Sequence, residues 1–271
     1  MPRALAMPDR TEPDLGWPAA DAAAGLAVAG RHTALGRPVL VGLAGSQGSG
    51  KSTMAPRLAA LLADRGLHTA ILALDDFYLT RAERAMLSQD VHPLLATRGV
   101  PGTHNVGLLS DALDVLLAGG SAHVPVFDKA NDDRAGSRTV AGPVDVVLLE
   151  GWCVGALPQP AVELAEPVNA LERFEDADGI WRRWVNDRLA TGYTGLFGRL
   201  DLTVVLRAPS FAVVERWRGE QEAHLGDRAM PPAALARFVQ HYERITRAML
   251  AGEPADLIVD LSAERVPVAI R

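Results

Sequence analysis

Short apolar runs alternate along the chain with longer segments whose apolar residues recur at helical spacing. The runs predict strands at 39–44, 68–74, 124–127, 144–149, 202–206 and 257–259. Between them, apolar faces predict helices, most clearly at 54–62, 109–117 and 235–249. The run at 144–149 is nearly all apolar, as is typical of a strand covered on both faces. This alternation predicts an α/β fold with a doubly wound, mainly parallel sheet and helices on both faces.

Two segments lack this regularity. Residues 1–37 are rich in Ala, Pro and Gly, and only 21–33 has helical character. We therefore expect a loosely attached N-terminal arm or short helix, followed by a single domain over 38–271. The segment 77–104 shows no clear periodicity and contains several charged residues. Because long irregular connections in compact domains are usually functional or disordered, 77–104 is a candidate part of a site.

The sequence G-x-x-x-x-G-K-S joins the first predicted strand to the helix that follows it. Its glycines let successive backbone N–H groups turn toward phosphate oxygens, and the helix N-terminus adds its positive dipole end. Lys51 would reach the β- and γ-phosphates, and Ser52 would ligate Mg²⁺. A chance Gly-Ser turn is the alternative, which the strand–helix context disfavours. The residues predicted to contact the nucleotide are Gly45, Ser46, Gln47, Gly48, Ser49, Gly50, Lys51, Ser52 and Thr53.

Lysine is rare in this chain. Of the 27 basic residues, only Lys51 and Lys129 are lysines. In so Arg-rich a composition, lysine is expected where a compact ammonium is needed and a planar guanidinium would not fit. Lys129 is therefore a second candidate for a chemical role, although an accidental position stays open.

Acidic residues follow two of the predicted strands. Ligands of open α/β sheets bind outside the carboxyl ends of the strands, where Asp75, Asp76 and Glu150 are placed. Phosphoryl transfer to an alcohol needs a phosphate cradle, Mg²⁺ and a carboxylate that accepts the hydroxyl proton. Asp75 or Asp76 can be this base, and Ser52, Asp75 and Glu150 are the candidate metal ligands. A helix cap or solvated turn is the alternative for the Asp pair, and the neighbouring phosphate loop favours the functional interpretation.

Three further groups carry charge. The segment 98–104 combines a guanidinium, an imidazole and flexible glycines that could clamp a small anionic or polyhydroxy substrate, but Thr103 could equally cap the next helix. The segment 128–134 follows a strand and, taken alone, is typical of a solvated loop. Arg216 and Arg218 could close over transferring phosphates or could form surface salt bridges.

Composition limits the partners. A net charge of −6 argues against nucleic-acid binding, which needs a basic face. The single cysteine, Cys153, excludes an intramolecular disulfide and a cysteine metal cluster, which fits a reducing compartment, so we expect a cytoplasmic protein. No uninterrupted apolar run is long enough for membrane insertion, and the oligomeric state stays open.

These segments together resemble the phosphoribulokinase/uridine kinase/pantothenate kinase superfamily, and within it the D-glycerate 3-kinase group. The D-x-F-Y sequence of that superfamily matches residues 75–78, and the segments specific to the group match 98–104, 127–129, 150–152 and 217–218. The resemblance covers the chain from about Val39 onward. Asn105, where Asp is expected, and the pair Gly219-Glu220 depart from the pattern.

The resemblance implies a P-loop NTPase-type fold with a helical lid and an ATP- and Mg²⁺-dependent kinase of a small hydroxylated metabolite. D-glycerate, phosphorylated to 3-phosphoglycerate, is the best single acceptor. The resemblance places the catalytic base on Asp75 and the phosphate-binding lysine on Lys51. The residues implied to bind the acceptor are Asp76, Tyr78, Arg98, His104, Asp128, Lys129 and Arg134; those implied to bind ATP outside the loop are Arg216 and Arg218.

Other functions stay open at this point. The acceptor could be a nucleoside, pantothenate or a sugar phosphate, and a non-catalytic ATP-binding regulator would carry the same loop. A GTPase switch would need an N-K-x-D sequence, but Lys129 is preceded by Asp128.

Overall fold

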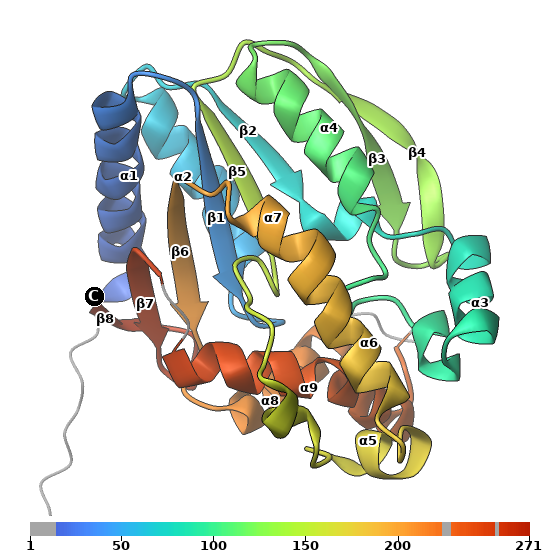
Figure 1. Ribbon diagram of the computed structural model, residues 1–271. Helices are drawn as coiled ribbons and strands as arrows, with labels where there is room; N and C mark the ends of the chain where they lie inside the picture. Colours follow the sequence, from blue (N-terminus) through green and yellow to red (C-terminus); the bar gives the residue numbers. More distant parts are fainter. Residues whose placement is uncertain (1–14, 224–228, 253–254) are drawn as a thin grey trace, which may run out of the picture.

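The computed structural model describes residues 15–223, 229–252 and 255–271. Its central sheet has the order β2-β5-β1-β6-β7-β8. The strands are β1 (Val39–Gly45), β2 (Thr69–Ala73), β5 (Val146–Gly151), β6 (Leu202–Arg207), β7 (Leu257–Leu261) and β8 (Pro267–Ile270). All neighbouring pairs are parallel except β7 with β8. The predicted mainly parallel α/β fold is confirmed (Figure 1).

Helices cover both faces of this sheet (Figure 1). The helices α1 (Gly16–Leu35), α2 (Lys51–Ala63) and α8 (Phe211–Ala223) share one apolar core with Val39, Val41 and Leu43 of β1. The helices α4 (Val106–Leu117), α6 (Ile180–Arg188) and α7 (Thr194–Phe197) share the other, which includes Leu40 of the same strand. Every residue of β1 is buried, so the strand that carries the phosphate loop is fixed from both sides.

The N-terminal segment differs from the expected loose arm. From Gly16 it forms the 20-residue helix α1, which packs on α2 through Ala20, Ala24 and Val28. Arg57 of α2 also holds Asp21 through two hydrogen bonds of 2.6 and 3.1 Å. The helical character predicted for 21–33 is confirmed, but the helix is longer, and its small alanine side chains give only a weak hydrophobic pattern from which to predict its length and packing. Residues 1–14 of the predicted arm lie outside the described residues.

The prediction of an irregular segment over 77–104 is wrong in part. The segment follows a short turn of 3₁₀ helix, η1 (Leu74–Phe77), and contains α3 (Arg81–Asp90) and a second 3₁₀ turn, η2 (Pro93–Ala96). Thr80 and Glu83 form a reciprocal capping box at the start of α3. The residue of α3 that is buried is Arg84, so the helix lacks the apolar face by which sequence periodicity finds helices.

A two-stranded antiparallel sheet lies apart from the main one. It pairs β3 (Ala122–Asp128) with β4 (Asp133–Val140), so the charged segment 128–134 is the exposed turn of a hairpin together with the ends of its two strands. The polar, largely exposed sequence of β4 gave no strand signal.

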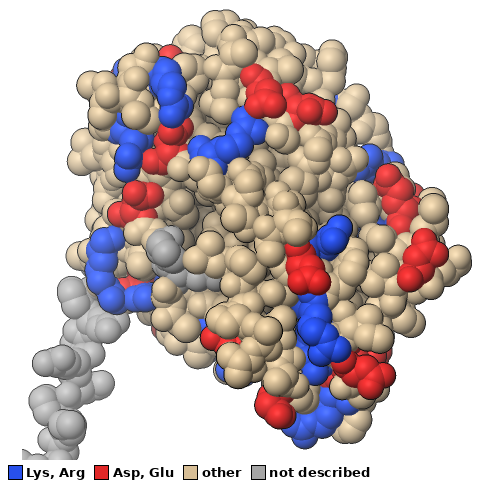
Figure 2. Space-filling model, viewed as in Figure 1, with Lys and Arg blue, Asp and Glu red and all other residues tan. Residues whose placement is uncertain are grey.

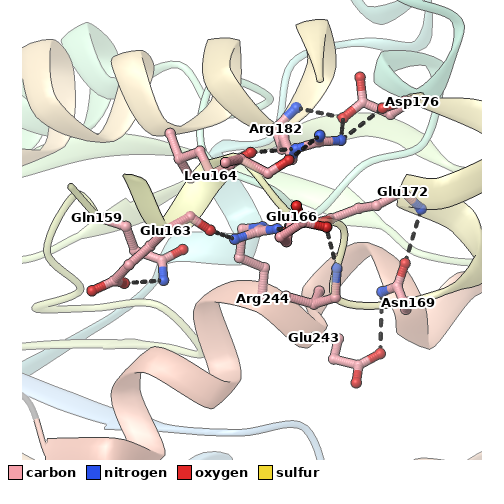
Figure 3. Close-up of polar contacts among 12 residues, drawn as sticks. Gln159, Glu163, Leu164, Glu166, Asn169, Glu172, Asp176, Arg182, Glu243 and Arg244 are labelled. Carbon is pink, nitrogen blue, oxygen red and sulfur yellow. Dashed lines mark hydrogen bonds and ion pairs between the residues drawn. The ribbon is translucent and has the colours of Figure 1, made fainter. Parts of the chain in front are cut away.

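Two further helices, α5 (Ala170–Glu175) and α9 (Pro232–Gly252), lie with α8 beyond the carboxyl ends of the strands (Figure 1), and these helices are the candidates for the predicted helical lid. Buried ion pairs tie this region together. Arg244 of α9 binds Glu172 of α5 at 2.6 and 2.8 Å, and Arg182 of α6 binds Asp176 at 3.0 Å (Figure 3). Both arginines also donate to backbone carbonyls, which lowers the cost of burying their charge.

The surface visible in Figure 2 carries Lys/Arg and Asp/Glu in small mixed groups. Among the described residues, no helix is long and apolar enough to cross a membrane.

Candidate active site

The phosphate loop lies between β1 and α2, as predicted. Gly48 and Gly50 have φ angles of +78° and +97°, which favour glycine. A Cβ atom on Gly48 would lie 2.6 Å from Cβ of Trp217, and one on Gly50 would lie 3.1 Å from the ring of Trp17. Lys51 donates from Nζ to the carbonyl of Ser46 at 3.1 Å. Two tryptophans therefore pack closely enough against the loop to fix its backbone.

The loop has the features of a phosphate site. The hydroxyl groups of Ser46 and Ser49 and both polar atoms of the Gln47 amide are buried, with no hydrogen-bond partner among the described residues. Such groups are normally satisfied in native proteins, and phosphate oxygens would satisfy the donors here. Burial lowers the pKa of Lys51, an effect opposed by the negative charges of Glu150 and Asp75. An anion beside Lys51 would oppose this lowering further.

Two of the three residues predicted to hold Mg²⁺, Ser52 and Glu150, come from the neighbouring strands β1 and β5, whereas the third, Asp75, follows β2, so its contact with the metal stays a prediction. Ser52, just after the loop, donates from Oγ to Glu150 Oε1 at 2.9 Å, and Glu150 lies in β5, which pairs with β1. The described residues contain no group of three or more His, Cys, Asp or Glu side chains that could hold a metal ion. Magnesium in nucleotide sites is usually bound by one or two protein oxygens together with phosphate oxygens and water. Ser52 and Glu150 fit this donor set.

The packing of Trp217 against the loop gives a first testable prediction. We expect Gly48→Ala to weaken ATP binding at least about tenfold. Alanine disfavours the positive φ at this position, and its methyl group would lie 2.6 Å from Cβ of Trp217. Isothermal titration with ATP measures the loss. Gly219→Ala is the matched control. Gly219 lies on α8, the helix that carries Trp217, and an added Cβ there meets nothing within 4 Å. Equal ATP affinity in the two variants would contradict this role of the contact.

Asp75 lies at the carboxyl end of β2 and is held by two donors. Lys129 Nζ is 2.6 Å from its Oδ2, and the Tyr78 hydroxyl is 2.9 Å from its Oδ1. Burial raises the pKa of Asp75, but the charge and hydrogen bond of Lys129, with smaller contributions from His104 and Tyr78, outweigh it and leave the pKa below the ordinary value. Asp75 is therefore ionised at neutral pH. The second lysine of the chain thus lies next to the proposed base.

Asp76 has different surroundings. It accepts a hydrogen bond of 3.4 Å from the Phe127 backbone and lies 3.8 Å from Arg138, so both contacts come from the β3–β4 hairpin. Burial raises its pKa above the ordinary value. These contacts support Asp75 over Asp76 as the base and give Asp76 a role in holding the hairpin.

The loop 98–104 lies against Tyr78. His104 stacks on the Tyr78 ring with 4.5 Å between centroids, and its Nδ1 is 2.7 Å from the hydroxyl of Tyr193. Thr103 is buried and binds the backbone of Gly99 and Val100 within the loop, whereas Asn105 caps α4 through the Leu108 N–H. The helix-cap alternative for Thr103 is therefore wrong, and Asn105 is occupied by the cap.

Arg98 reaches the turn of the hairpin. It forms a close ion pair with Asp132, contacts the Lys129 carbonyl at 3.4 Å and covers the Phe127 ring. Asp132 also binds the fully buried Arg84 at 2.6 Å. Its φ of +54° is a backbone conformation that residues other than glycine rarely adopt. Asp132 thus links α3, the loop 98–104 and the turn that carries Lys129, a role that the sequence did not reveal.

The remaining predicted residues have mainly structural contacts. Arg134 donates from Nε to the Tyr78 carbonyl at 2.9 Å, while its buried Nη2 has no hydrogen-bond partner in the described part of the chain. Asp128 accepts hydrogen bonds from Ala130 and Asn131 inside the hairpin turn. Arg216 pairs with Glu220 and Glu264. Arg218 pairs with Glu222 at 2.6 Å, so contact of either helix arginine with ATP stays a prediction.

Comparison with known proteins places this geometry in a family. A family model described as methylmalonyl-CoA mutase-associated GTPase MeaB matches residues 17–80, which run from α1 past the phosphate loop to Asp75 and Tyr78. A kinase of Schizosaccharomyces pombe, named uncharacterized kinase mug58, is 35% identical over 222 residues, which cover 76% of this chain and 79% of that protein.

Two D-glycerate 3-kinases are also similar. The chloroplastic enzyme of Arabidopsis thaliana is 30% identical over 257 residues, which cover 85% of this chain and 54% of that protein, so the chain spans about half of its length. The solved structure of D-glycerate 3-kinase from Cryptococcus neoformans var. grubii matches with a TM-score of 0.80 and 26% identity, over 93% of this chain and 99% of that one. The phosphate loop, the acidic strand ends and these similarities show that the chain belongs to the P-loop kinase family of the uridine kinase and D-glycerate 3-kinase type.

Proposed function

We propose that this kinase transfers the terminal phosphoryl group of ATP, with Mg²⁺, to a hydroxyl group of D-glycerate. The observation that carries the proposal is an ionised carboxylate, Asp75, held by Lys129 at the same sheet edge as the phosphate loop. The strand order β2-β5-β1 brings Asp75, Glu150 and the loop together at this edge. The similarity of the chain to two proteins named D-glycerate 3-kinase supports D-glycerate as the acceptor.

Each residue has a distinct proposed task. When bound, ATP would supply the phosphoryl group and leave as ADP, and Mg²⁺ would neutralise the charge that develops on the phosphate oxygens. Lys51 and the loop amides hold the phosphates, and Ser52 and Glu150 hold the metal. Asp75 accepts the proton of the acceptor hydroxyl, for which its ionised state prepares it.

The acceptor is proposed to be a hydroxy acid because cations lie beside the base. A carboxylate entering a water-poor site needs a fixed positive partner. Lys129 contacts Asp75 directly, and Arg98 contacts the carbonyl of Lys129. Tyr78 contacts Asp75 through its hydroxyl, and one face of its ring already stacks on His104, which makes it a poor platform for a nucleobase.

We expect D-glycerate to stimulate ADP release more strongly than uridine, pantothenate or a sugar phosphate. A coupled assay over these acceptors measures the effect, and mass spectrometry of the product identifies the phosphorylated hydroxyl. Arg98→Ala should raise the KM for D-glycerate at least about tenfold and leave the KM for ATP nearly unchanged, since it removes acceptor binding.

Arg65→Ala serves as the control for Arg98→Ala. The Arg65 side chain donates to the Leu61 carbonyl near the far end of α2, away from the loop and from Asp75, so its loss should change neither KM. Stimulation by uridine with no response to D-glycerate would instead assign the chain to nucleoside phosphorylation.

A further inference from the structure

Tyr193 connects the segment after α6 to the loop 98–104. It ends a π-helical turn, η4 (Leu189–Tyr193), that follows α6, and its side chain is 1% exposed. π-Helical turns are rare and are found frequently at functional sites. Here the turn directs one tyrosine hydroxyl at two groups of the loop: the backbone N–H of Gly102 at 3.0 Å and Nδ1 of His104 at 2.7 Å.

The hydrogen bonds of Tyr193 determine the tautomer of His104. The Tyr193 oxygen accepts the Gly102 N–H, so its own hydroxyl proton remains to be donated. Because the hydroxyl is buried, this proton needs an acceptor, and the acceptor within hydrogen-bond distance is His104 Nδ1. His104 then carries its proton on Nε2. The opposite tautomer would leave both the hydroxyl proton and the Nε2 lone pair without a partner.

His104 is neutral under these conditions. Burial lowers its pKa to about 4, an effect that the negative charge of Asp75 only partly opposes. Burial also raises the pKa of Tyr193, so the tyrosine keeps its hydroxyl proton. The pair therefore holds one defined arrangement across the neutral pH range.

The remaining N–H of His104 lies in the surroundings of the proposed base. His104 stacks on Tyr78, and the Tyr78 hydroxyl donates to Asp75. Nε2 of His104 is buried and has no hydrogen-bond partner among the described residues. A buried donor left unpaired beside a catalytic carboxylate is the arrangement expected of a group that binds the substrate.

We propose that Tyr193 is a positioning residue that fixes His104 as the Nε2–H tautomer, and that this N–H donates to an oxygen atom of the acceptor substrate next to Asp75. The inference rests on the proposed acceptor site at Asp75 but not on the choice of D-glycerate, because a carboxylate or hydroxyl oxygen of any small acceptor would serve.

The first test reads the tautomer without any turnover. Long-range ¹H–¹⁵N spectra of the ¹⁵N-histidine-labelled protein should show His104 with a protonated Nε2 and an unprotonated Nδ1 at neutral pH. In Tyr193→Phe the signals should move toward the other tautomer or toward a mixture. Tyr242→Phe is the matched control. It removes another buried tyrosine hydroxyl that contacts the loop 98–104, where it donates to the Arg98 carbonyl at 3.0 Å, and it should leave the His104 tautomer unchanged. A protonated Nδ1 in the unsubstituted protein would overturn the inference.

The second test uses whichever acceptor the ADP-release screen identifies. Tyr193→Phe should raise the KM for this acceptor roughly tenfold, the factor expected for one hydrogen bond to a charged or strongly polar partner, with the KM for ATP unchanged. His104→Leu should raise it at least as much, and His104→Gln, which retains an N–H donor, should recover part of the loss. Unchanged acceptor KM values in Tyr193→Phe and His104→Leu would overturn the inference while the kinase activity stands. Absence of turnover with every acceptor would count against the proposed function instead, and the tautomer measurement would remain valid.

Discussion

Asp75→Asn is expected to lower kcat by about 10²–10⁴-fold while ATP still binds. This is the usual effect of losing a general base, and asparagine keeps the shape of the side chain while removing its ability to accept a proton. Titration with ATP should show near-normal affinity, because the hydrogen bonds that Asp75 forms are with Lys129 and Tyr78. Rapid-quench measurement of a single turnover would locate the loss in the chemical step.

Asp76→Asn is the control for this assignment. Asp76 contacts the Phe127 backbone and Arg138, so its replacement should weaken acceptor affinity or Mg²⁺ dependence and spare kcat. A greater loss of kcat in this variant than in Asp75→Asn would reverse the two roles. The pH profile provides a second check. Since the pKa of Asp75 lies below its ordinary value, kcat should fall on the acid side only below about pH 4, the ordinary range of Asp, as the base becomes protonated.

Lys51→Ala is expected to lower kcat at least about a hundredfold. The ammonium lies in the phosphate loop with its Nζ on the Ser46 carbonyl, and the loss of one preorganised charge-stabilising donor has this size of effect in other enzymes. Steady-state assays at saturating acceptor, together with titration of ATP, measure the loss of turnover and of nucleotide binding.

The melting temperature distinguishes a direct loss of catalysis in Lys51→Ala from misfolding of the variant. Burial disfavours the charged ammonium of Lys51, so its removal should leave the melting temperature unchanged or raise it while activity is lost. Lys51→Arg should not restore turnover, because a planar guanidinium does not fit where a compact ammonium is enclosed. Near-normal turnover in either variant would remove the basis for assigning a nucleotide-transfer site here.

The sequence by itself determined the parallel strands of the sheet and the phosphate loop, but not the antiparallel edge strand β8. The five parallel strands were predicted at nearly their observed positions, because each is an apolar run whose burial leaves a direct mark on residue type. The loop was predicted residue by residue for a similar reason: its backbone needs glycine at Gly48 and Gly50, and it needs a lysine at the start of the helix. Asp75 and Glu150 followed, since the carboxyl ends of parallel strands meet at one edge.

Only the tertiary structure decided which side chains support this site. Tyr193 and His104 are 89 residues apart in the chain, and the contact of Gly48 with Trp217 likewise depends on the docking of one element on another. The buried face of α1 is mostly small residues, which gave only a weak hydrophobic pattern, and that of α3 carries an arginine, which gave none. A local sequence pattern indicates whether a residue is buried and whether its backbone needs a positive φ. The partner of a polar side chain depends instead on packing between segments that are distant in the chain, which a single sequence does not reveal.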